Sequence, residues 1–119
     1  MKNRICSALA LLIIGGSALV MPFATAQPAI RVIEISARRF EFTPNPVTLK
    51  KGEPVTIRLT AIDRAHGLLV KELGIELDAG KDEPDQVTIT PKAAGRFAAI
   101  CDHYCGSGHG GMKMTFIVE

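Results

Sequence analysis

Short runs of alternating apolar and polar residues extend from residue 30 to the end of the chain. The alternation is clearest at residues 55–60, 87–90 and 114–118, where Val, Ile, Leu, Met or Phe occupies every second position. This period of two is typical of β-strands that bury one face. Clusters of Gly, Pro, Asn and Asp separate the runs, and these residues favour turns. The pattern predicts an all-β fold, an antiparallel sandwich or barrel.

Less regular apolar stretches predict the remaining strands, and one segment is ambiguous. Residues 72–81 fit either a strand or an irregular loop. The chain has no Trp and one Tyr, so the core must be mainly aliphatic. The further strands are expected at 30–35, 47–49, 68–70 and 97–100. The largest core side chains are expected to be Phe40, Phe42, Phe97 and Phe116.

Residues 1–26 have the layout of a secretory signal peptide, separate from the domain. Lys2 and Arg4 form a positive head, an almost wholly apolar stretch follows, and Ala24-Thr25-Ala26 is a small-residue cleavage signal. We expect cleavage after Ala26, which leaves one periplasmic domain at residues 27–119. An uncleaved membrane anchor is the alternative, because the apolar stretch approaches the roughly 17 to 25 residues that cross a bilayer.

The leader also accounts for the net charge and for one of the cysteines. The formal charge of +2 belongs to Lys2 and Arg4, because acidic and basic residues are otherwise equal in number. A neutral domain gives no reason to expect a nucleic-acid partner. Cys6 lies in the leader, so the domain keeps only Cys101 and Cys105. In an oxidising compartment, one interpretation of this pair is a disulfide.

The neighbours of the cysteine pair favour a metal site instead. Residues 101–112 combine two thiols with His103, His109 and the thioether of Met112. Soft sulfur together with imidazole is the donor set that selects copper. A disulfide would need neither His109 nor Met112. We therefore expect a copper-binding loop, with His66 upstream as a further candidate ligand.

Two spaced patterns in the domain carry a family resemblance. The first is Phe42-x-Pro44-x-x-Val47-x-Leu49-x-x-Gly52-x-x-Val55-x-Ile57, which His66 follows. The second is Cys101-x-His103-x-Cys105-Gly106-x-x-His109-x-x-Met112. Over most of residues 30–119 the chain resembles the cupredoxin family. The second pattern is similar to the binuclear CuA loop of cytochrome c oxidase subunit II and nitrous oxide reductase. The resemblance implies a Greek-key β-sandwich with its ligands on loops at one end.

The resemblance also implies a ligand set for two copper ions. Two thiolates would bridge the ions, and each ion would gain one imidazole and one weaker donor: Cys101 and Cys105 as bridges, His66 with Met112 on one ion, His109 with the main-chain carbonyl of His103 on the other. Residue 103 is often Glu in the oxidase subunit. Because the donor there is a backbone oxygen, His103 need not remove the ligand, and we expect its side chain to be exposed or behind the ligands.

Taken singly, some of these residues allow plainer interpretations. His66 alone would suggest an exposed loop histidine. Met112 could be a core residue, which is what we expect of Met114. The acidic segment 82–85 could dock a basic cytochrome, although charged loops are more often simply solvated.

The sequence therefore predicts an extracytoplasmic one-electron carrier with a CuA-type centre, served by a c-type cytochrome or another periplasmic redox protein. No open copper position would remain for a substrate, so an enzyme is not expected. Membrane contact is expected only through an uncleaved leader or an oxidase partner. One alternative is a protein that binds or delivers copper without electron transfer. Another is a thiol–disulfide redox protein using Cys101 and Cys105, although its thioredoxin-like fold would need βαβ units.

Overall fold

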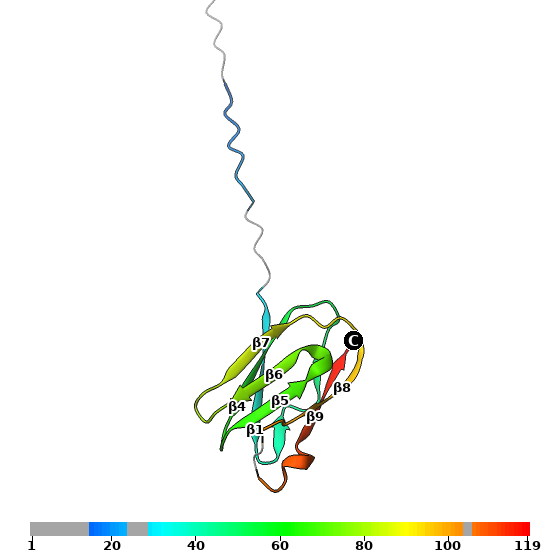
Figure 1. Ribbon diagram of the computed structural model, residues 1–119. Coiled ribbons are helices and arrows are strands. Elements are labelled where there is room, and N and C mark those ends of the chain that lie inside the picture. Colours follow the sequence, from blue (N-terminus) through cyan, green and yellow to red (C-terminus); the bar gives the residue numbers. More distant parts are fainter. Residues whose placement is uncertain (1–14, 24–28, 104–105) are drawn as a thin grey trace, which may run out of the picture.

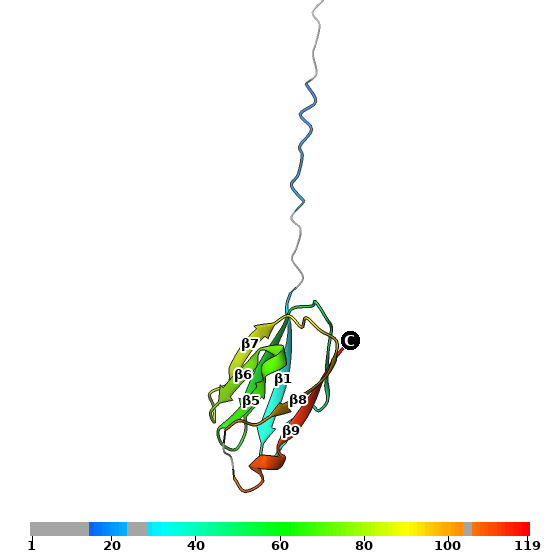
Figure 2. The same cartoon turned by 45° about the vertical axis from the view of Figure 1, so that its right-hand side comes forward.

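The strands of the domain form two sheets packed face to face. The computed structural model describes residues 15–23, 29–103 and 106–119. Within them a four-stranded sheet has the order β2-β1-β4-β7, and a five-stranded sheet has the order β3-β9-β8-β5-β6. Figures 1 and 2 show the two layers from directions 45° apart. The predicted β-sandwich is confirmed.

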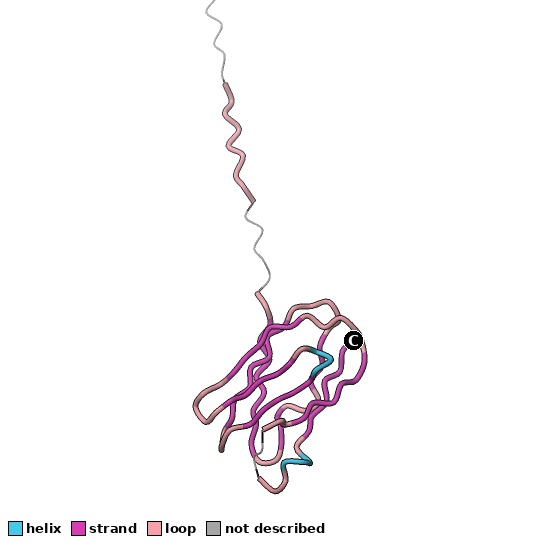
Figure 3. The backbone as a smooth tube through the Cα atoms, in the orientation of Figure 1, coloured by secondary structure: helices cyan, strands magenta, loops and turns pink. Residues whose placement is uncertain are grey.

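The first sheet contains β1 (Arg31–Arg38), β2 (Glu41–Thr43), β4 (Val55–Ala61) and β7 (Asp85–Ile89). The second contains β3 (Val47–Leu49), β5 (His66–Val70), β6 (Ile75–Ala79), β8 (Gly95–Ile100) and β9 (Lys113–Val118). Two short 3-10 helices, cyan in Figure 3, are η1 (Lys71–Leu73) and η2 (His109–Gly111).

The alternation of the sequence sets the buried face of each strand. Strand β9 buries Met114, Phe116 and Val118, and strand β6 buries every second residue from Ile75 to Ala79. The ambiguous segment 72–81 is therefore largely strand. Its first two residues belong to η1, whose C-cap is Gly74 with a φ of 70°, a left-handed conformation that Gly adopts without steric cost.

The core is mainly aliphatic, as predicted, with one exception among the aromatic residues. Phe42 and Phe116 are buried, and Phe97 is half-buried and packs against the core cluster. Phe40 was expected in the core, and that prediction is wrong because 40% of it is exposed. It lies with Arg39 in the tight turn between β1 and β2, where the alternation of a strand no longer applies.

Two of the strand pairs are parallel, which corrects the expectation of a purely antiparallel fold. Strand β1 runs parallel to β4, and β3 runs parallel to β9. The other pairs are antiparallel. Side chains alternate between the two faces in either kind of pair, so the sequence pattern does not distinguish them.

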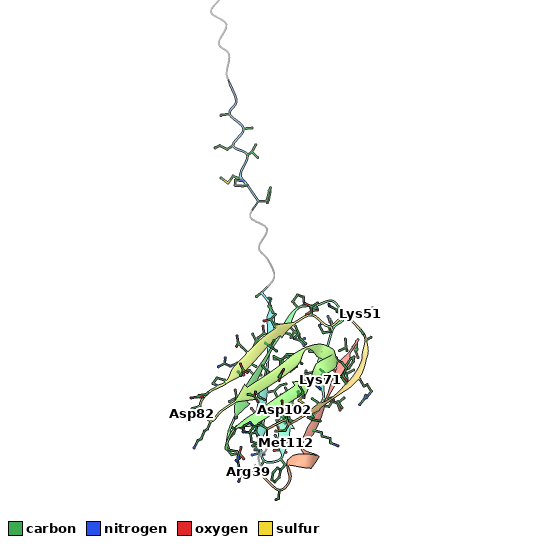
Figure 4. All side chains as sticks on the ribbon, in the orientation of Figure 1. Arg39, Lys51, Lys71, Asp82, Asp102 and Met112 are labelled. Carbon is green, nitrogen blue, oxygen red and sulfur yellow. The ribbon has the colours of Figure 1, made fainter. Side chains whose placement is uncertain are left out.

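The two ends of the sandwich are formed by different segments of the chain. At the end that is lower in Figure 1, the β1–β2 turn and the segment between β8 and β9 lie close together. At the opposite end, Lys51 N–H donates to Glu119 O at 2.9 Å and Gly52 N–H donates to Pro91 O at 2.8 Å. Figure 4 shows the separation: Arg39, Asp102 and Met112 lie toward the lower end, and Lys51 lies at the upper end.

Little of the leader is described. Residues 15–23 have no secondary structure and are exposed, and the predicted cleavage position after Ala26 lies outside the described residues. In the part of the chain that the structure describes, no helix has the length and hydropathy needed to cross a bilayer.

Candidate metal centre

Three of the predicted ligands lie at the same end of the second sheet. His66 begins β5, Cys101 directly follows β8, and Met112 directly precedes β9. All three are buried, with exposed fractions of 0%, 3% and 1%. Since Met112 belongs to the core cluster, its burial is compatible with both a ligand and a core residue.

The strand register explains why these residues approach one another. Strands β8 and β9 pair with Ile100 opposite Lys113, so Cys101 and Met112 extend that pairing, and Cys101 N–H donates to Met112 O at 3.3 Å. Strand β5 pairs antiparallel to β8 with Leu69 opposite Ile100. Residues before Leu69 therefore lie toward residues after Ile100, which brings His66 toward this segment.

The side chain of Asp102, in the segment after β8, lies over Gly67 of β5. A Cβ atom at Gly67 would overlap the carboxylate of Asp102 and would come within 3.1 Å of Asp78 Oδ1. A side chain at the position next to His66 would therefore displace the carboxylate of Asp102.

The first part of the loop also brings a sulfur and a carbonyl together. The thiol of Cys101 donates a hydrogen bond to the carbonyl oxygen of His103, with an Sγ–O distance of 3.1 Å. The His103 residue is exposed, which agrees with the expectation for its side chain. Both donors that the resemblance implies for this segment, a thiolate and a backbone oxygen, thus lie within one short turn.

The remaining predicted ligands are not tested by the structure. Cys105 lies outside the described residues, and His109 begins η2. Among the described residues, no group of three or more His, Cys, Asp or Glu side chains is close enough together to hold a metal ion. That absence concerns only His, Cys, Asp and Glu side chains. It does not extend to the thioether of Met112 or the backbone carbonyl of His103, which are also proposed donors.

His66 provides the main test of whether the site suits a metal. Its Nε2 lies 2.6 Å from Asp63 Oδ1, and none of the described residues hydrogen-bonds to its buried Nδ1. A buried nitrogen without a partner is rare and costs free energy. The complete burial of His66 also makes the alternative of an exposed loop histidine wrong.

The ionisation of Asp63 determines which nitrogen of His66 carries the proton. Partial burial raises the pKa of Asp63. Hydrogen bonds from Arg39 N–H, the His66 ring and Arg64 N–H, together with charge attraction to His66, outweigh it and lower the pKa from 3.8 to about 2. An ionised carboxylate only accepts hydrogen bonds. The proton of a neutral His66 ring is therefore assigned to Nε2, which leaves a lone pair on Nδ1. A second group that fixes the tautomer in this way is typical of metal-binding histidines.

Phe40 covers the glycines of the ligand loop. A Cβ at Gly108 would lie 2.5 Å from Phe40 Cδ2, and one at Gly106 would lie 3.2 Å from Cε1 and Cζ of the same ring. Gly106 also has a φ of 138°, which favours glycine. Neither the position of Phe40 nor the role of Asp63 was predicted. For Phe40, the sequence signal was an apolar residue in a turn. For Asp63, it was an acidic residue three positions before the candidate ligand His66.

A model of the family described as a cupredoxin-like domain matches residues 8–118 of the sequence. The chain belongs to the cupredoxin family. Cytochrome c oxidase subunit 2 of Thermus thermophilus is 31% identical to this cupredoxin over 87 residues, which are 73% of the chain and 64% of the relative. This cupredoxin thus spans less than two thirds of the length of that relative.

Solved structures show the same fold. The periplasmic domain of cytochrome oxidase subunit II of Bradyrhizobium japonicum has a TM-score of 0.70 and 15% identity, covering 78% of this cupredoxin and 86% of that chain. The metal-binding domain of the Cu(I)-exporting P-type ATPase of Streptococcus pneumoniae, with Cu(I), has a TM-score of 0.61 and 26% identity, covering 81% and 92%. Together with the family match, these likenesses identify a copper-binding cupredoxin domain.

Proposed function

We propose that this cupredoxin transfers single electrons through a binuclear CuA-type copper centre outside the cytoplasm. The observation that carries the proposal is the buried Nδ1 of His66, which lacks a partner among the described residues. It lies at the end of the sheet that also holds the Cys101 thiol, the His103 carbonyl and Met112. The second thiol of the loop, Cys105, and the resemblance of the loop pattern to the CuA loop support two ions rather than one.

The proposed ligand set follows from the donors in the loop. Each ion would have two bridging sulfurs, one imidazole and one weaker donor: Cys101 and Cys105, His66 and Met112, His109 and the carbonyl oxygen of His103. When bound, the copper pair would supply a one-electron couple whose charge is shared by both ions. Because thiolates, not thiols, bind metals, the proton that Cys101 now donates to His103 O would be released on binding.

The surroundings of the donors suit electron transfer better than catalysis. Cys101 and Met112 are buried in the core cluster, which keeps water away and restricts the movement of the ligands. All positions on the ions would be occupied by protein donors, so no substrate could bind. We therefore propose a carrier and not an enzyme, with a c-type cytochrome or another periplasmic redox protein as its partner.

The signal peptide, its cleavage after Ala26 and export to the periplasm remain part of this proposal. Docking through the acidic segment 82–85 remains a prediction.

A second candidate function is copper binding or delivery without rapid electron transfer. It is favoured by the likeness to the metal-binding domain of a Cu(I)-exporting ATPase. Thiol–disulfide exchange is less favoured, because the Cys101 thiol is buried and exchange requires access to the sulfur.

Electron paramagnetic resonance of the copper-loaded protein tests the binuclear centre. We expect two copper ions per chain and an unpaired electron split by two equivalent copper nuclei. The variant Cys105→Ser should lose this signal, because one bridge would be missing. Splitting by a single nucleus in the unaltered protein would contradict the proposal.

Rapid reduction by a c-type cytochrome then separates a carrier from a copper-delivery protein. We expect the loaded protein to accept one electron per centre in stopped-flow measurements. A correctly formed centre that exchanges no electrons, but passes copper to an acceptor protein, would favour the second candidate.

A further inference from the structure

The carboxylate of Asp63 joins two parts of the ligand end that are far apart in the sequence. Its Oδ2 accepts a hydrogen bond from Arg39 N–H at 2.9 Å. Its Oδ1 accepts from His66 Nε2 at 2.6 Å and from Arg64 N–H at 2.9 Å. The β1–β2 turn of the first sheet and a proposed ligand at the start of a strand in the second sheet are thus held by one side chain.

The turn held by Asp63 carries the aromatic ring that covers the loop. Phe40 directly follows Arg39, and its ring occupies the space that a Cβ at Gly106 or Gly108 would need. We refer to the Arg39–Phe40 turn, with its ring on these glycines, as the Phe40 cap. Phe40 is partly exposed, so the cap lies at the surface of the molecule.

The strands next to the cap have an anchor that does not involve Asp63. Ile62 N–H donates to Ala37 O at 2.9 Å, and β1 and β4 are paired up to Ala37 and Ala61. Loss of the Asp63 carboxylate would therefore weaken the hold on the cap without separating the strands. The same loss would remove the acceptor that orients His66.

We propose that Asp63 is a positioning residue that couples the orientation of the His66 ring to closure of the Phe40 cap over Gly106 and Gly108. With the carboxylate in place, a hydrogen bond holds Nε2 of the ring, and the Phe40 ring lies on Gly106 and Gly108, in the loop that follows the buried Cys101. Opening of the cap would free this loop and so expose the Cys101 thiol. The inference rests on the proposed function only in treating His66 as a ligand. The coupling itself is a property of the metal-free protein.

Alkylation of Cys101 in the reduced, metal-free full chain measures closure of the cap. Iodoacetamide is the probe, and fragment-ion mass spectrometry counts Cys6 and Cys105 separately from Cys101, because Cys105 shares a tryptic peptide with Cys101. Asp63→Ala and Phe40→Ala should each raise the alkylation rate of Cys101 by about tenfold, the equilibrium factor for losing one hydrogen bond or a comparable contact. The matched control is Glu76→Ala, which removes an exposed carboxylate from β6 and should leave the rate unchanged.

The double variant decides whether the two residues act through the same closure. If they do, Asp63→Ala combined with Phe40→Ala should be no faster than the faster single variant. If the rate increase of the double variant equals the product of the two single increases, the coupling is overturned. An unchanged alkylation rate in a folded Asp63→Ala protein would also overturn it.

Nuclear magnetic resonance of the His66 ring nitrogens supplies a test that leaves Asp63 in place. Phe40→Ala removes a partly exposed side chain, so it should fold even where Asp63→Ala does not. Coupling predicts that the spectrum of this variant shows a second ring tautomer or exchange broadening. A spectrum identical to that of the unaltered protein would overturn the proposal. Because both tests use metal-free protein, their outcome is independent of how many copper ions the loaded protein binds.

Discussion

The thiol of Cys101 donates its hydrogen bond to the carbonyl oxygen of His103 at 3.1 Å. Two donors of different kinds, a sulfur and a backbone oxygen, are therefore adjacent in the fold. The second donor belongs to the main chain, so its position depends on the path of the backbone and not on the identity of residue 103.

Replacement of the His103 side chain should therefore have little effect on the centre. In His103→Glu we expect two copper ions per chain and an unchanged electron paramagnetic resonance spectrum, because the carbonyl oxygen remains and the residue is exposed. Loss of one copper ion in this variant would show that the imidazole itself is a ligand.

Met112→Leu separates the ligand role from the core role of this residue. Leu has a similar volume, so the free energy of unfolding of the metal-free protein should fall by less than about 1.5 kcal/mol. The thioether is lost, so the spectrum of the copper-loaded protein should change. An unchanged spectrum and reduction potential would make Met112 a core residue only. Met114→Leu, also buried, is the control and should leave the spectrum as it is.

Gly108→Ala should destabilise the metal-free protein by about 1 to 3 kcal/mol, the usual cost of overpacking. The new methyl group would lie 2.5 Å from the Phe40 ring. Gly110→Ala is the matched control, because no described atom comes within 4 Å of a Cβ at that position. Urea unfolding measures both. Combining Gly108→Ala with Phe40→Ala should restore part of the loss, and equal stability of the two glycine variants would contradict the contact.

The stability of the metal-free protein should depend on pH through Asp63. The pKa of this group is about 2 in the folded protein against an ordinary value of 3.8, so ionisation favours folding above the ordinary value. This contribution should be lost as the pH falls from about 4 to about 2. Urea unfolding of the unaltered protein and Asp63→Asn, compared across this range, measures it. The difference in stability between them should shrink toward low pH, and a constant difference would count against the ionised carboxylate.

The sequence predicted the parts of the fold that depend on local pattern. Alternation along β4 and β9 identified these strands and their buried faces, and Gly and Pro marked the turns. Strand β2 was not predicted, because three residues around Phe42 are too few to show a period. The parallel pairing of β1 with β4 was also missed, since it depends on how the chain crosses between sheets.

For the site, residue types and spacing identified the candidate donors, but not the groups that hold them. His66 was predicted as a ligand from its resemblance to a family pattern, and the structure shows that it is buried. Asp63 and Phe40 act through contacts with residues 24 and 68 positions away in sequence, Arg39 and Gly108 respectively. No local pattern encodes such contacts.

The hydrogen bond from Cys101 N–H to Met112 O has a consequence for metal affinity. It joins the two ends of the ligand loop, as a continuation of the β8–β9 ladder. Closing a flexible loop costs conformational entropy, and here that cost is met when the sandwich folds. An incoming ion therefore encounters a loop whose first and last side-chain donors are preorganised, and more of its binding free energy is retained as affinity.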